Sequence, residues 1–329
     1  MARTVRYRAI ALLAALLVAR APAAAGGLAG PAFSDPDGVI EMPAAWRQRG
    51  IEYQAWARGA DLAVSLDQHL YPALLPIVRR FAEESGLRIA VQEGTCGISA
   101  GKLEEKTVDM GGFCCPAGRT DRLPGLEFHT LGVASLALFV HARNPVDTVS
   151  LKEARGIFRG EVYRWAEVAP ATGEGLIQPI GRLHCKARPG HWRLILDNED
   201  LFSPRLYEVP TIPDMLRAVA NDPRAIGYEV IWNVAESRLR SRLKFLEVNG
   251  VEPRDRQALA AGEYPLYRVY NVATWGPEQV QNEHAGALLA YLYEHFEEVE
   301  PRYGIVPAER LREQGWRFRG DELIGGPMR

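Results

Sequence analysis

The 329-residue sequence lacks the features that identify several classes of protein. Its 39 basic residues are outnumbered by 41 acidic ones, whereas a general nucleic-acid-binding protein carries a basic excess. It has no repeat of fixed period, and its composition, 47% hydrophobic and 24% charged, excludes collagen-like and low-complexity chains. Four cysteines are too few for a disulfide scaffold. A folded globular protein that does not bind nucleic acid is therefore expected.

The few cysteines also lack the spacings of common metal and haem motifs. No pair forms a CxxC, and no CxxCH is present, so neither a zinc ribbon nor c-type haem attachment is indicated. Two of the cysteines are adjacent in the chain, and a vicinal disulfide between them would be strained. The chemistry of these residues has to be inferred from their surroundings.

Residues 1–25 have the pattern of a secretory signal peptide. Three arginines occur within the first eight residues, residues 9–19 are apolar, and Ala21-Pro22-Ala23-Ala24-Ala25 offers small residues for cleavage. The apolar run is shorter than the roughly 20 residues that a membrane-spanning helix needs, and no cysteine lies nearby for lipid attachment. We expect a periplasmic protein whose mature form carries 35 basic and 41 acidic residues.

The length exceeds the roughly 250 to 300 residues that one hydrophobic core usually serves, so two lobes are expected. Apolar runs and alternating patterns predict strands that are separated by helical periodicities. Such alternation indicates an α/β protein with largely parallel sheets. The predicted strands are 62–64, 87–91, 108–112, 131–141, 177–180, 225–228 and 243–248, and the predicted helices are 71–86, 100–106, 150–160, 213–220 and 284–296.

Six short motifs occur in an order that resembles the phosphate-binding family of bacterial periplasmic solute-binding proteins, which are receptors of ABC importers. Each motif alone is weak, and their shared order over residues 61–300 carries the resemblance. The motifs are Gly94–Ile98, Val108–Gly111, Leu136–Val140 with Asn144-Pro145-Val146, Gly156–Gly160 with Trp165, Ala225–Tyr228 and Gly262–Leu266.

The resemblance implies a two-lobed periplasmic binding protein fold, type II-like, with two crossing strands near residues 136–141 and 264–274. Lobe 1 would comprise 61–140 and 265–329, and lobe 2 would comprise 141–264, with 26–60 as an N-terminal extension. Lobes joined in this way close around a ligand in the cleft between them. A monomer that delivers its ligand to an ABC permease, or reports it to a sensor kinase, is expected.

The resemblance also places a pocket at the loops that follow the strands, although the side chains there depart from the family pattern. Relatives cradle an anion with hydroxyl groups, an arginine and the N–H groups of helix N-termini. Here Arg182 matches the family's arginine, but the Ser-Gly-Thr that should follow it is absent. The expected ligand-binding residues are Asp67, Gln68, His69, Thr95, Cys96, Cys114, Cys115, Arg182, His184, Cys185 and Lys186.

By this alignment, all four cysteines lie on pocket loops. They could form two structural disulfides, or each could be a small buried residue. Alternatively, Cys96, Cys114, Cys115 and Cys185 could bind a soft metal, a metalloid or a metal cofactor, together with His69, His184 or His191. Arg182, Lys186 and Arg188 are then expected to lower the pKa of nearby thiols.

These observations lead to one expected function and two alternatives. We expect capture of a small, phosphate-like oxyanion in the interlobe cleft, for import or sensing, with no resident cofactor. The first alternative is binding of a soft metal or metalloid in the same cleft. The second, less favoured, is a thiol enzyme with Cys185 activated by His184 or His191, or a redox protein that uses Cys114 and Cys115. We expect no enzymatic activity.

Overall fold

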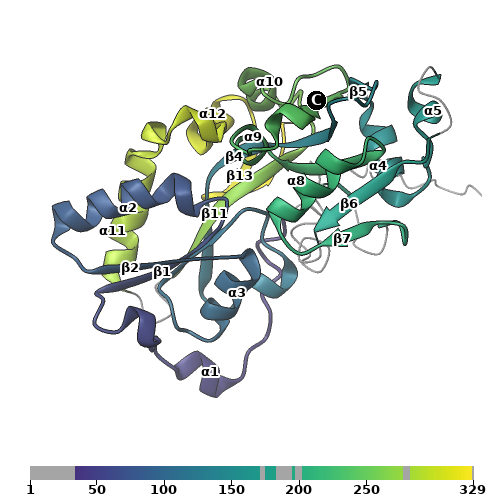
Figure 1. Cartoon of the computed structure of the whole chain (residues 1–329). Helices are drawn as coiled ribbons and strands as arrows, with labels where there is room; N and C mark the ends of the chain where they lie inside the picture. Colours follow the sequence, from purple (N-terminus) through teal and green to yellow (C-terminus); the bar gives the residue numbers. More distant parts are fainter. Residues whose placement is uncertain (1–33, 171–174, 183–194, 197–201, 277–281, 328–329) are drawn as a thin grey trace, which may run out of the picture.

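The computed structural model describes residues 34–170, 175–182, 195–196, 202–276 and 282–327 (Figure 1). The expected signal peptide and the basic loop that follows Arg182 lie outside these ranges. Within them, no helix combines the length and the apolar character needed to cross a membrane.

A large mixed sheet forms the centre of the molecule. Its strands follow the order β2-β1-β3-β11-β4-β8-β6-β7, and β12 and β9 both pair with β4. Two further pairs, β10 with β5 and β13 with β14, lie apart from it. The strands are β1 (Leu62–Asp67), β2 (Ile89–Gly94), β3 (Met110–Phe113), β4 (Leu126–His141), β5 (Thr148–Val149), β6 (Gln178–Arg182), β7 (Tyr207–Val209), β8 (Ala225–Val230), β9 (Leu243–Phe245), β10 (Glu247–Val248), β11 (Tyr267–Trp275), β12 (Ile305–Pro307), β13 (Arg317–Arg319) and β14 (Glu322–Gly325).

Strands β4 and β11 run between the two ends of the sheet as crossing strands (Figure 1). Strand β11 is antiparallel to both of its neighbours, β3 and β4, and β4 is antiparallel to β8. The described parallel pairs of this sheet lie toward its two ends: β1 pairs in parallel with β2 and β3, and β6 pairs in parallel with β7 and β8. The expectation of largely parallel sheets is therefore wrong for the centre, because the crossing strands run in opposite directions. The expected α/β, two-lobed fold class is confirmed.

The helices begin and end at residues whose chemistry favours those positions. The predicted 150–160 helix is confirmed as α4: Ser150 and Glu153 form a capping box, and Gly160 ends the helix with a φ of 81°. The helices are α1 (Ala44–Gln48), α2 (Tyr71–Ser85), α3 (Cys96–Glu104), α4 (Leu151–Arg159), α5 (Trp165–Val168), α8 (Ile212–Asn221), α9 (Ile231–Ala235), α10 (Arg256–Ala260), α11 (Glu283–Glu294) and α12 (Ala308–Glu313), with short 3-10 turns at 55–57, 119–121, 240–242, 296–298 and 301–303.

Two separate hydrophobic cores lie on either side of the crossing strands. The first core contains Leu66 of β1, Leu74 of α2 and Leu288 of α11. The second core contains residues of α4, α8 and β8, and it also takes in Trp316 and Leu323 near the C-terminus. The lobe boundaries stay a prediction. Residues near the C-terminus contact both sides: Trp316 and Leu323 pack in the second core, whereas Glu322 pairs with Arg122.

Candidate ligand-binding site

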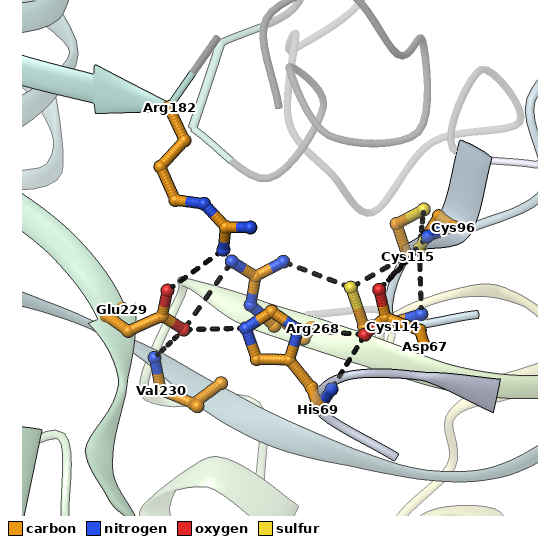
Figure 2. Close-up of polar contacts among 9 residues, drawn as sticks. All are labelled: Asp67, His69, Cys96, Cys114, Cys115, Arg182, Glu229, Val230 and Arg268. Carbon is orange, nitrogen blue, oxygen red and sulfur yellow. Dashed lines mark hydrogen bonds and ion pairs between the residues drawn. The ribbon is translucent and has the colours of Figure 1, made fainter. Parts of the chain in front are cut away.

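Eight side chains from both sides of the crossing strands meet in what we call the buried cluster (Figure 2). Each of the eight residues is at most 1% exposed. Most of them stand at the ends of elements, where a strand gives way to a loop or a helix begins. The members are Asp67 at the end of β1, His69 after β1, Cys96 at the start of α3, Cys114 and Cys115 after β3, Arg182 at the end of β6, Glu229 in β8 and Arg268 in β11.

His69 connects the two sides of the buried cluster. Its Nδ1 lies 2.8 Å from Oδ1 of Asp67, and its Nε2 lies 2.8 Å from Oε1 of Glu229. The backbone N–H of His69 also donates to Asp67 Oδ1, over 2.9 Å. Asp67 belongs to β1 beside the first core, and Glu229 belongs to β8 beside the second. A single imidazole therefore ties together the two halves of the molecule.

Glu229 is surrounded by positive charge. Arg182 Nη1 donates to its Oε2 over 3.3 Å, and Arg268 Nη2 lies 3.8 Å from its Oε1. The N–H of Val230 also donates to Oε1 (2.8 Å). Burial acts to raise the pKa of Glu229, but the charges of His69, Arg268 and Arg182 outweigh it and hold the pKa well below its ordinary value. Glu229 is thus an ionised carboxylate at neutral pH.

Three thiols form the other end of the buried cluster. The Sγ atoms of Cys96 and Cys114 are 3.4 Å apart, and those of Cys96 and Cys115 are 3.7 Å apart. All three cysteines are free. Cys96 Sγ lies 3.4 Å from Oδ2 of Asp67, and Arg268 Nη1 donates to Cys114 Sγ over 3.4 Å. One oxygen of Asp67 and the sulfurs of Cys96 and Cys114 lie within 4.8 Å of one another, which is close enough to hold one metal ion.

The expectation that basic neighbours lower the thiol pKa values is wrong for the three described cysteines. Burial raises the pKa of Cys96 and of Cys114 well above the ordinary value. For Cys115, the hydrogen bond with Cys114 and burial raise the pKa in the same way. Desolvation of the thiolate outweighs the nearby charge, so these thiols are neutral in the absence of a ligand.

The carboxylate of Asp67 lies at the N-terminus of α3, which is where the family pattern predicts a bound anion. Oδ2 of Asp67 accepts a hydrogen bond from the N–H of Cys96 over 3.1 Å. The hydroxyl of Thr95 accepts another from the N–H of Ile98 (3.3 Å) and so acts as the helix N-cap. Thr95, which is half-buried, thus caps α3 beside the cluster. The protein's own side chains satisfy donors that could otherwise hold an anion.

One further predicted residue, Gln68, lies outside the buried cluster. Gln68 is half-buried and lines a separate cavity of about 460 Å³, together with Glu93 and residues of α8 and α9. His184, Cys185 and Lys186, with Arg188 and His191, lie outside the described residues. The structure thus brings together Asp67, His69, Cys96, Cys114, Cys115 and Arg182, and their roles as ligand-binding residues stay a prediction.

Sequence reasoning missed three residues of this region: Glu229, Arg268 and Tyr270. The first two are charged residues within strands that are otherwise almost wholly apolar, β8 and β11. A charge inside such a strand is unusual unless it has a buried partner, and this signal could have found them. Tyr270 is fully buried, and its hydroxyl has no hydrogen-bond partner among the described residues.

Comparison of the sequence with known proteins finds distant relatives. No family model matches the chain. It is 23% identical over 220 residues to the phosphate-binding protein PstS of Bacillus subtilis, covering 66% of this chain and 70% of that protein. It is 24% identical over 192 residues to PstS of Pseudomonas aeruginosa, covering 54% of this chain and 57% of that protein. These relatives are binding proteins and not enzymes.

Solved structures share the fold. A putative phosphate ABC transporter substrate-binding protein from Clostridium perfringens, solved with bound phosphate, gives a TM-score of 0.62 at 14% identity and covers 75% of this chain and 99% of that one. An ABC-type phosphate transport receptor from Vibrio cholerae gives 0.59 at 16% identity, covering 74% and 99%. The expected resemblance to this type of solute-binding protein is thus confirmed for sequence and fold.

Proposed function

Because this chain is similar in sequence and fold to phosphate-binding receptors of ABC importers, we propose that it is a periplasmic solute-binding protein that holds a small ligand at the buried cluster. The observation that carries the proposal is the contact between His69 and Glu229, whose Nε2 and Oε1 atoms lie 2.8 Å apart. His69 follows β1 on one side of the molecule, and Glu229 lies in β8 on the other. The cluster is assembled from both sides of the crossing strands, as a site that closes around its ligand has to be.

Burial of the cluster supports this role. Its residues are at most 1% exposed, so a ligand there would be separated from water. Charged groups act more strongly on a ligand in such an environment than at the surface. Entry and release would require the two sides to move apart about the crossing strands β4 and β11, and this motion is the signal that a permease or a sensor kinase could read.

Native mass spectrometry of the protein purified from its periplasm tests the receptor role. We expect one small ligand bound to each folded chain, and we expect the ligand to be lost when the protein unfolds. Glu229→Ala, which removes the connection to β8, should abolish retention of that ligand. A chain that carries no small molecule, and binds none from a periplasmic extract, would contradict the receptor role.

A small oxyanion is one candidate ligand. Arg182 matches the arginine of the phosphate-binding family, and Arg268 adds a second buried guanidinium. Glu229 already lies against Arg182, however, and Asp67 already occupies the N–H of Cys96 at the start of α3. An anion would have to displace these carboxylates, so we expect weaker binding of phosphate than a site without them would give.

Titration calorimetry with inorganic phosphate, and with sulfate for comparison, tests the oxyanion candidate. If phosphate binds, Arg182→Ala should weaken it by about 1.5–3 kcal/mol, since a hydrogen bond to a charged group is lost. The free energy of unfolding should change less, because Glu229 keeps Arg268 and His69 as partners. Equal phosphate affinity in both proteins would reject the role of Arg182. An absence of binding to wild type would remove the oxyanion candidate.

A further inference from the structure

We infer that the thiol end of the buried cluster is a binding site for a soft, thiophilic metal ion, with Cys96, Cys114, Cys115 and Asp67 as its ligands. This inference makes the proposed receptor function more specific. It rests on that function only for what the protein does with the ion once the ion is bound, and not for the binding itself. It specifies a ligand class different from the phosphate of the relatives. The described structure places an oxygen of Asp67 and the sulfurs of Cys96 and Cys114 within 4.8 Å of one another, and Cys115 Sγ lies 3.7 Å from Cys96 Sγ.

The spacing of three donor atoms, from Asp67, Cys96 and Cys114, fits a single metal ion. With bonds of about 2.3 Å to sulfur and about 2.0 Å to oxygen, a tetrahedral site has sulfur atoms about 3.8 Å apart and an oxygen about 3.5 Å from each sulfur. Cys96 Sγ lies 3.4 Å from Cys114 Sγ and 3.7 Å from Cys115 Sγ, and it lies 3.4 Å from Asp67 Oδ2. Cys115 Sγ lies outside this group of three, so its side chain would have to move toward the other donors to supply the fourth ligand.

The donor types select the class of ion. Three sulfur ligands favour soft or borderline ions such as Zn²⁺, Cd²⁺ and Cu⁺ over Mg²⁺ or Ca²⁺, which prefer oxygen. A bound metal ion deprotonates a thiol, so three protons would leave to solvent as the ion binds. Arg268 donates to Cys114 Sγ, and a guanidinium at this position would stabilise the thiolate form of that ligand.

A purely structural role explains the cluster less well. Cysteines buried as small apolar residues need no charged partners, yet here an aspartate and an arginine lie directly against them. The hydroxyl of Tyr270 is fully buried and has no hydrogen-bond partner among the described residues, and the charge of Arg268 acts on this phenol. A buried polar group without a partner needs an explanation, and a site for a water or an ion is one of them.

Metal binding to the purified, reduced protein tests the inference. With Zn²⁺ or Cd²⁺ alone as the probe, we expect one ion per chain by equilibrium dialysis and elemental analysis. Cd²⁺ should produce thiolate-to-metal charge-transfer absorption. Cys96→Ser and Cys114→Ser should each weaken binding at least about 100-fold, since both remove a ligand.

Asp67→Asn and Asp109→Asn form a matched pair. Both aspartates are buried in the same half of the molecule, but Asp109 accepts hydrogen bonds from Tyr53 and Ala63 instead of contacting a thiol. We expect Asp67→Asn to weaken Zn²⁺ binding at least about 10-fold and Asp109→Asn to leave it unchanged. Urea unfolding of each variant, without metal, separates loss of a ligand from loss of the fold.

Two results would overturn the inference. The first is a Cys96–Cys114 disulfide, detected by thiol counting on the unfolded periplasmic protein without reductant. The second is equal Zn²⁺ affinity in wild type and Cys96→Ser. If either occurs while native mass spectrometry still finds a bound small molecule, the receptor function stands and only the metal site is rejected. If Zn²⁺ binds as expected but the periplasmic protein carries no ligand, the receptor function fails and the metal site remains.

Discussion

Glu229 is the residue on which the charge balance of the buried cluster depends. It is the carboxylate that Arg182, Arg268 and His69 share, and it is fully buried. Its replacement leaves positive groups buried without compensation, which typically costs about 3–5 kcal/mol. We expect Glu229→Gln to lower the free energy of unfolding by roughly that amount in urea denaturation at pH 7.

A surface variant and a pH series control this prediction. Glu252→Gln, at an exposed carboxylate paired with Arg254, should change stability by less than about 1 kcal/mol. The pKa of Glu229 is lowered in the folded protein, so its contribution is fully present above the unfolded pKa of about 4.5. The difference between wild type and Glu229→Gln should therefore narrow as the pH falls below that value. A constant difference down to pH 3 would contradict an ionised Glu229.

How well single residues could be predicted depended on where they stand in the chain. Asp67, His69 and Cys96 follow or precede recognisable elements, and their loops align with the motifs of a known family. Glu229 and Arg268 stand inside strands, and no local pattern shows that the 38 intervening residues fold so that Arg268 lies beside Glu229. The prediction that the thiol pKa values are lowered was wrong for a similar reason. Burial raises these pKa values, and burial depends on the assembled fold and not on neighbouring residues in the sequence.

At the scale of elements, α3 presents Cys96 to the cluster, and Thr95 fixes where this helix begins. The Thr95 hydroxyl accepts from the N–H of Ile98. We expect Thr95→Ala to lower the free energy of unfolding by about 1 kcal/mol, as for other N-cap threonines. Thr95→Ser keeps the hydroxyl and should retain most of that stability. Equal stability of the Ala and Ser variants in urea denaturation would reject the capping role.

The elements themselves could be predicted better than their pairing. The predicted helix over 71–86 is present as α2, and the predicted 213–220 helix as α8, because apolar periodicity, prolines and glycine stops are local signals. Strand direction is not local. The antiparallel pairing of β11 with β3 and β4 joins segments more than 125 residues apart. The contact of Tyr267 with Trp316, with ring centroids 4.9 Å apart, likewise brings the C-terminal segment to the second core.

At the scale of the whole molecule, the two hydrophobic cores and the crossing strands would allow the opening and closing that a receptor needs. The cores are separate clusters, so each side could move as a unit while β4 and β11 bend. Apart from these strands, His69 and Glu229 form a direct polar connection between the sides. A hydrogen bond to a charged group contributes about 1.5–3 kcal/mol. That amount would shift an equilibrium between closed and open forms by about tenfold or more.

We therefore expect His69→Ala to favour the open form of the ligand-free protein. Glu229 would keep Arg182 and Arg268 as partners, so each side should remain folded. Small-angle X-ray scattering should give a larger radius of gyration than for wild type. His129→Ala is the matched control, since His129 is also a buried histidine with two partners, Thr274 and Asp321, but does not contact the cluster. It should keep the wild-type radius, and an unchanged radius in His69→Ala would mean that the crossing strands alone hold the two sides together.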